Sequence, residues 1–140
     1  MAKDIDPTEF QEVMDRVFEL MSEDPDMGPK LRDADVPQRF EFTDFDLVLN
    51  VRAAQPGEDG TLHWEWSDEV DWEPKVRMTM SSETANKYFQ GKENVAMAIA
   101  RRRIKTGGDV KAALALLPIT KPLEPLYRQM LEDEYPHLVA

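Results

Sequence analysis

The sequence contains no cysteine, so it offers neither a disulfide framework nor a thiolate metal site. No apolar run approaches the ~20 residues that a bilayer-spanning helix needs. The first six residues also lack the basic-then-apolar layout of a signal peptide. These absences lead us to expect a cytoplasmic protein.

Catalytic and cofactor motifs are also missing. The two histidines, His63 and His137, have no partner at a metal-ligand spacing. No Gly-x-Ser-x-Gly elbow, Gly-x-Gly-x-x-Gly turn or phosphate-cradling loop occurs. Paired carboxylates such as Asp44 and Asp46 lie at turn positions, where solvated surface is their simplest interpretation. We therefore expect no metal, no cofactor and no enzymatic activity.

Positive charge is scarce, because 17 Lys and Arg residues face 28 Asp and Glu residues, for a net charge of −11. Such an acidic chain is a poor candidate for binding nucleic acid. The segment from Ala98 to Pro122 is different, since it holds six basic residues and one acid. Its local charge is thus +5, and the remainder carries −16. This cluster is either a solvated face or a transient contact with an anionic membrane surface through Arg101, Arg102, Arg103 and Lys105.

Alternating apolar and polar residues are the strongest pattern that the sequence does contain. Successive side chains of a strand point to opposite faces, so each alternating run predicts a strand with one apolar side. The three runs place the following apolar residues on one face: Phe45, Leu47, Leu49, Val51 and Ala53; Leu62, Trp64 and Trp66; Val76, Met78 and Met80.

Short connections rich in Gly, Pro and Asp join these runs, at residues 55–60 and 68–74. Such links suit antiparallel neighbours, so we predict a three-stranded meander. Phe40 and Phe42 either extend the first strand backwards or form a short piece of their own. Trp72, in the second connection, is either a lid or contact point, or folds back onto the meander.

Helical periodicity surrounds the predicted strands. Asp6, Pro7 and Glu9 form a helix start, and apolar residues follow at spacings of three and four. Residues 22–29 predict a turn, and residues 31–39 an irregular segment with one short turn of helix. Further helices are expected over 82–90, 94–100, 109–117 and 123–134, with a strand between Arg102 and Gly108.

The second half resembles the bacterial branch of the sterol carrier protein type two family. The resemblance rests on the order of four short pieces: residues 88–94 (YFQGKEN), the Ala-rich 96–100, the basic 104–107 ending in Gly, and Leu114 to Pro118 followed by Tyr127-Arg128. Arg102 stands near a position where these sequences often have Gly, and Gly108 adds a second glycine at the turn.

This resemblance implies an α+β fold over residues 1–140 as one domain. The implied fold has an antiparallel sheet of about five strands, helices over one face, and an apolar tunnel between the two layers. The resemblance also implies binding and transfer of a fatty acid, acyl-CoA or sterol-like lipid without chemistry. The residues expected to line the tunnel lie on the apolar stripes of their elements: Leu49, Trp64, Trp66, Met78, Met80, Phe89, Met97, Leu114, Leu117 and Met130.

Two alternatives stay open from the sequence. In one, the same fold is filled by its own side chains and acts as an accessory module that contacts an enzyme of lipid metabolism. In the other, loop carboxylates such as Asp44 and Asp46 act on a hydrophobic substrate, which would require raised pKa values. The sequence identifies neither a particular lipid nor an oligomeric state.

Overall fold

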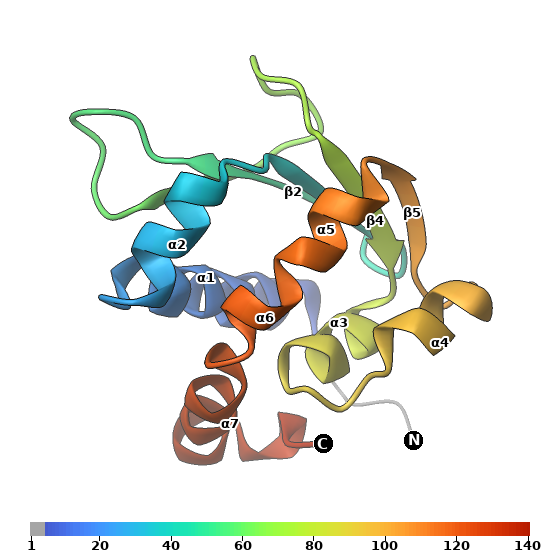
Figure 1. Ribbon diagram of the computed structural model, residues 1–140. Coiled ribbons are helices and arrows are strands. Elements are labelled where there is room, and N and C mark those ends of the chain that lie inside the picture. Colours follow the sequence, from blue (N-terminus) through green and yellow to red (C-terminus); the bar gives the residue numbers. More distant parts are fainter. Residues whose placement is uncertain (1–4) are drawn as a thin grey trace.

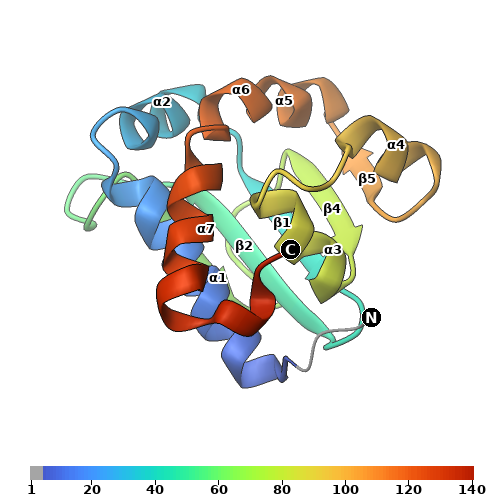
Figure 2. The same ribbon diagram turned by 90° about the horizontal axis from the view of Figure 1, so that it is seen from below.

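The alternating runs build a five-stranded sheet in the computed structural model, which describes residues 5–140. The strands are β1 (Gln38–Phe42), β2 (Leu47–Ala53), β3 (Leu62–Trp66), β4 (Val76–Met80) and β5 (Lys105–Gly108). Their order across the sheet is β3-β2-β1-β4-β5. The helices all lie over one face of this sheet (Figure 2), so the fold is α+β in two layers.

The predicted meander is only half right. Strands β2 and β3 form the expected antiparallel hairpin, but β4 pairs in parallel with β1, where Phe40 lies opposite Met78. The sheet is therefore mixed rather than antiparallel. The Phe40–Phe42 piece is the central strand, and not an extension of β2. An alternating pattern determines which side of a strand is buried, but it does not select the neighbour, and this is why the pairing was missed.

The connection from β3 to β4 crosses the face of the sheet that points away from the helices. The Asn50 side chain donates to the carbonyl of Ser67, and Arg39 donates to the carbonyl of Asp68. Trp72 lies against the guanidinium of Arg52, 4.8 Å from the ring centroid, and edge-on to His63. Trp72 thus folds back onto the sheet, as one of the two sequence interpretations expected.

Within residues 5–140, seven α-helices and a short 3₁₀ turn make up the second layer (Figure 1). They are α1 (Pro7–Glu23), α2 (Met27–Ala34), α3 (Ser82–Phe89), α4 (Val95–Ala100), α5 (Val110–Ala115), α6 (Leu117–Thr120), α7 (Leu123–Glu134) and η1 (Pro136–Leu138). The helix start predicted at Asp6 is confirmed, because Asp6 accepts from the Glu9 N–H at 2.8 Å, and the helix expected from residue 109 is capped by Asp109, which accepts from the Ala112 N–H at 3.0 Å.

Helix α2 was not predicted, because its Gly28 and Pro29 read as turn residues in the sequence. Both lie in the first turn, where proline is tolerated because the first N–H groups have no intrahelical partner. Asp24 stabilises the beginning of α2, since its carboxylate accepts from the N–H groups of Asp26 and Met27. The extra helix matters for function because it forms one wall of the cavity described below.

Aromatic side chains meet where α1 lies against the sheet. Phe18 of α1 contacts Phe40, Trp64 and Phe89, with ring centroids 5.9–6.0 Å apart. Helix α7 packs beside α1, which places Tyr127 in the interior. Each such aromatic pair contributes about 0.5–1.5 kcal/mol beyond the area that it buries. This half of the helical layer is therefore held firmly on the sheet.

One carboxylate joins α1 to the edge strand. Oδ1 of Asp15 accepts from the indole N–H groups of both Trp64 and Trp66, at 3.0 and 2.8 Å. The two tryptophans are half-buried, so their N–H groups find this partner at the rim of the core. Asp15 thus fixes the orientation of both rings against α1.

We expect Asp15→Ala to lower the free energy of unfolding by about 1–3 kcal/mol, because two indole donors lose a charged acceptor. Asp15→Asn keeps an acceptor oxygen and is the matched control, with a smaller loss. Urea denaturation followed by tryptophan fluorescence measures both variants. Equal stability of Asp15→Ala and the parent protein would show that the shared carboxylate contributes nothing.

Candidate ligand-binding site

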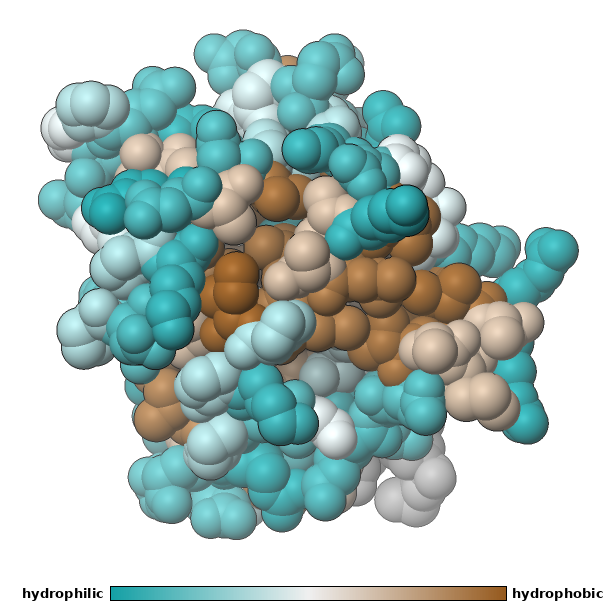
Figure 3. Space-filling view, viewed as in Figure 1, coloured by the Kyte–Doolittle hydropathy of each residue, from teal (hydrophilic) through white to brown (hydrophobic). Residues whose placement is uncertain are grey.

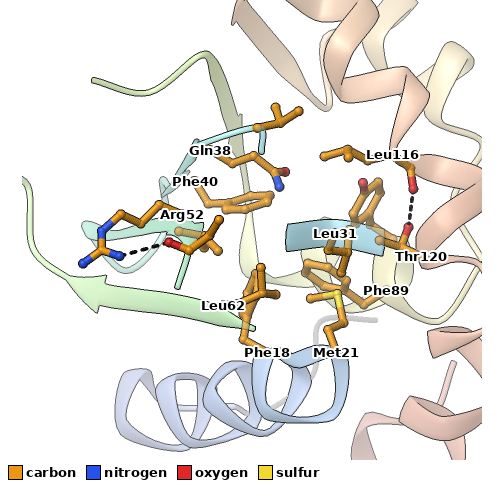
Figure 4. Close-up of a pocket in the computed structure, with 14 residues that line it drawn as sticks. Phe18, Met21, Leu31, Gln38, Phe40, Arg52, Leu62, Phe89, Leu116 and Thr120 are labelled. Atoms are coloured by element: carbon orange, nitrogen blue, oxygen red, sulfur yellow. Dashed lines mark hydrogen bonds between the residues drawn. The ribbon is translucent and has the colours of Figure 1, made fainter. Parts of the chain in front are cut away.

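An apolar cavity lies between the sheet and helices α1, α2, α3 and α6 (Figure 4). Phe40 and Val51 form its floor on the sheet, Phe18 and Met21 one side, and Phe89 the far side. The other lining residues are Leu31, Val36, Gln38, Arg52, Ala53, Leu62, Tyr88, Leu116 and Thr120. Its volume is about 40 Å³, whereas ligand sites usually measure about 300–1,000 Å³. Such a volume holds about one water molecule and no acyl chain.

The few polar groups around this cavity are neutral or turned outward. The Arg52 guanidinium points away from the cavity and donates to the Ala53 carbonyl and to Glu58 (Figure 4). The Thr120 hydroxyl donates to the Leu116 carbonyl at 3.2 Å. Burial raises the pKa of the Tyr88 phenol to about 12, and the Glu124 carboxylate adds to this shift. Tyr88 is therefore uncharged near neutral pH, and the site favours an apolar occupant.

A second hollow adjoins the cavity and measures about 380 Å³. It lies between α3, α6 and the start of α7, and is open to solvent. Tyr88, Phe89 and Thr120 line both spaces, so these three side chains form the partition between them. If the partition moved, the joined space would fall within the usual range of ligand sites.

The cover over the cavity is thinnest at α5 and α6. Neither helix contains a buried residue, and Leu116, between them, is the one side chain of residues 110–120 that is buried. By contrast, α1 contributes seven buried residues. Elements with few buried apolar contacts open at low free energy. The α5–α6 segment is thus a lightly packed part of the helical layer.

The structure brings two of the ten predicted lining residues to these spaces. Phe89 lines both, and Leu117 lines the open hollow. Leu49, Met78, Met80 and Met130 are packed in the core away from both. Met97 and Leu114 lie on the surface, each 42% exposed. Trp64 and Trp66 are oriented by Asp15 at the sheet edge.

Several lining residues were missed by the sequence. Leu31 and Val36 lie in and after α2, which was expected to be turn and irregular chain. Phe18 lies off the main apolar stripe of its helix in the sequence, and that position was the available signal for a second packing surface. Leu116 carried no signal, since its neighbours Leu114 and Leu117 fit the helical stripe better.

Asp44, one of the two candidate carboxylates, has a structural partner. Both oxygens of Asp44 accept from Ser82, one from its N–H at 2.8 Å and one from its hydroxyl at 2.6 Å. Asp44 therefore holds the start of α3. Within residues 5–140, no group of three or more His, Asp or Glu side chains could hold a metal ion. Over the same residues, no helix is both long and apolar enough to cross a bilayer.

The model of the SCP-2 sterol transfer family matches residues 15–121, which is most of the chain. The chain belongs to the SCP-2 sterol transfer family. None of the curated proteins matches it in sequence. The resemblance that the sequence pieces indicated is thereby confirmed, and so is the α+β class of the fold.

Solved structures share this SCP-2 fold. The sterol carrier protein domain 2 of Helicoverpa armigera aligns with a TM-score of 0.61 at 18% identity, over 89% of this chain and 96% of that one. The UbiJ-SCP2 ubiquinone synthesis protein gives 0.61 at 11% identity, over 84% and 97%. The sec-alkylsulfatase Pisa1 from Pseudomonas sp. gives 0.61 at 18% identity over 76% of this chain, which spans 16% of that enzyme. At these identities the likeness shows the fold alone.

Arg102 of this SCP-2 protein has a φ of +62°, in the left-handed region that favours glycine. The resemblance noted in the sequence places Arg102 near a position where glycine is common, and its backbone has the conformation that glycine adopts most readily. The cost is modest strain, and the result is an exposed arginine just after α4.

At the end of β2, beside the cavity, Glu58 and Arg52 form a two-pronged ion pair at 2.7 and 2.9 Å. The Arg52 guanidinium and then the Gln55 N–H lower the pKa of Glu58 to about 2. Because this folded-state pKa lies below the unfolded value of about 4.3, the contribution of Glu58 to stability is present above that value. It disappears as the pH falls through about 2.

We therefore expect the stability difference between the parent protein and Glu58→Gln to be constant above about pH 5. It should shrink steadily toward pH 2. Denaturant unfolding of both proteins across this range measures the difference. A difference that stayed the same from pH 6 to pH 2.5 would contradict the ion pair.

Proposed function

We propose that this chain binds and transfers a fatty acyl or sterol-like lipid, without chemistry, in a tunnel made by joining the two spaces. The supporting observation is the shared partition: Tyr88, Phe89 and Thr120 line both the apolar cavity and the larger hollow beside it. The ligand enters as α5 and α6 move outward and the partition side chains turn aside. Sterol transfer, the activity in the name of the matched family, supports the same proposal.

The energetics favour such an opening. A 14-carbon chain yields on the order of 11 kcal/mol gross, at ~0.8 kcal/mol per buried methylene. Exposing Leu116 costs about 1.5–3 kcal/mol, and the ordering of ligand and protein removes several more. The ligand therefore stabilises an open state that is scarce without it. Exchange with a membrane is closer to neutral, since the chain moves between two apolar surroundings, and this makes transfer reversible.

Thr120→Trp tests this site, because an indole at the partition would occupy the junction of the two spaces. We expect the parent protein to bind cis-parinaric acid, a fluorescent long-chain fatty acid, in a saturable manner. Thr120→Trp should bind it at least tenfold more weakly. Thr8→Trp, at an exposed position in the first turn of α1, is the matched control and should bind like the parent.

If neither cis-parinaric acid nor the fluorescent sterol dehydroergosterol bound the parent protein, lipid binding would be refuted. Equal weakening by Thr8→Trp would show that the added indole, and not the blocked junction, is responsible. Circular dichroism spectra and melting temperatures of both variants show whether each one folds.

A second candidate function is an accessory module with a filled interior. The observation in its favour is the cavity of about 40 Å³, which is too small for a lipid as it stands. The similarity to UbiJ-SCP2, a ubiquinone synthesis protein, supports a role beside an enzyme that handles hydrophobic compounds. Lipid binding by the parent protein favours the first proposal. Its absence, together with capture of an enzyme of lipid metabolism, favours the second.

A further inference from the structure

Large apolar side chains lie exposed on the outer side of α4 and α5. Within residues 5–140 the large exposed apolar residues are Met97 on α4, Leu114 on α5 and Leu126 on α7. Figure 3 shows that α4 and α5 belong to a continuous apolar band. This band runs from the gap between α2 and α6 across α5 to α4. Val95 and Ile99 of α4 and Leu117 and Ile119 of α6 are partly exposed. Contiguous apolar surface of this kind marks an interaction site.

Basic residues accompany this band in the chain. Arg101, Arg102 and Lys105 follow α4, Lys111 lies in α5 and Lys121 ends α6, and all five are exposed. None of these five forms an ion pair with another described residue, whereas Arg103 is paired with Glu93 at 2.6 Å. The segment has a charge of +5, although the rest of the chain carries −16. The basic residues are thus concentrated in the segment that carries the exposed apolar side chains of α4 and α5.

We propose that this α4–α6 face (residues 95–121) docks onto the surface of an anionic lipid bilayer. Met97 and Leu114 enter the interface between head groups and acyl chains, while Arg101, Lys105 and Lys121 contact the head groups. Apolar insertion and attraction to anionic lipids together determine the binding strength of such surfaces. The acidic remainder is repelled by the same bilayer, so this one face is turned toward it.

Charge also argues against a second copy of this chain as the occupant. Two α4–α6 faces set against each other would bring together two surfaces of +5, and like charges across an interface are unfavourable. A bilayer with anionic lipids supplies the opposite charge and an apolar layer at once. The inference goes beyond the proposed function, because docking requires no ligand in the cavity. It also gives the thin α5–α6 cover a surface on which to open.

The test is cosedimentation of the full chain with vesicles of phosphatidylcholine, either pure or containing phosphatidylglycerol. We expect binding to the anionic vesicles, at least tenfold weaker binding to the pure ones, and a loss of binding as salt is raised. The double variant Met97→Glu/Leu114→Glu should bind at least tenfold more weakly. Arg101→Gln and Lys105→Gln should each weaken binding about fivefold, since each basic residue near such a surface contributes about 1 kcal/mol.

Leu126→Glu is the matched control, because Leu126 on α7 is 40% exposed and lies outside the α4–α6 face. It should bind anionic vesicles like the parent protein. No vesicle binding, binding that ignores lipid charge, or equal loss in Leu126→Glu would each overturn the proposal. If the parent protein self-associated without binding vesicles, and Met97→Glu/Leu114→Glu abolished this self-association, the face would be assigned to a second copy of the chain instead. Met97→Glu/Leu114→Glu should still bind cis-parinaric acid like the parent protein, because neither residue lines the cavity or the hollow, so failure of docking and failure of lipid binding are distinguishable.

Discussion

Covering the apolar face of the five-stranded sheet is the constraint on which the remaining structure depends. One half of that face lies beneath α1 and α7, where the aromatic contacts of Phe18 and the buried Tyr127 hold the layers together. The other half lies beneath α2, α5 and α6, where Leu116 is the main apolar contact from the last two helices. The cover is thus firm on one side and light on the other.

This asymmetry connects the fold to lipid binding. A uniformly packed interior would have to break many contacts before it admitted a guest, because close-packed cores do not deform continuously. Here the small cavity lies beside the light part of the cover, and the partition of Tyr88, Phe89 and Thr120 separates it from the open hollow. In the function that we propose, the open, loaded state differs from the closed state described here by the movement of a few side chains and two short helices. The α4–α6 face, with its exposed apolar band, lies on the outside of the same cover.

Local features of this arrangement were predictable from the sequence, whereas long-range ones were not. The caps at Asp6 and Asp109 and the β2–β3 hairpin followed from residues close together in the chain. The parallel pairing of β1 with β4 did not, because its partners are more than thirty positions apart. The link from Asp15 to the two tryptophans spans 49 and 51 positions, and no periodicity carries it.

The candidate site shows the same division. Phe89 was predicted correctly as a residue on an inward apolar stripe. Met97 and Leu114 belong to stripes of equal quality, yet both face outward. A short helix shows from its periodicity that one side is apolar, but not whether that side meets the core or the surroundings. The sequence therefore predicted a lipid-binding family and an apolar layer, but not the division of that layer between an interior and an exposed face.

The most direct test of a guest beneath the light cover is nuclear magnetic resonance of the ¹⁵N-labelled protein titrated with oleate. A lipid in the joined space would shift the amide signals of Leu31, Phe89, Leu116 and Thr120, and those of the α1 and α7 interface much less. An unchanged spectrum, or shifts confined to exposed positions such as Met97 and Leu114, would contradict a ligand between the helices and the sheet.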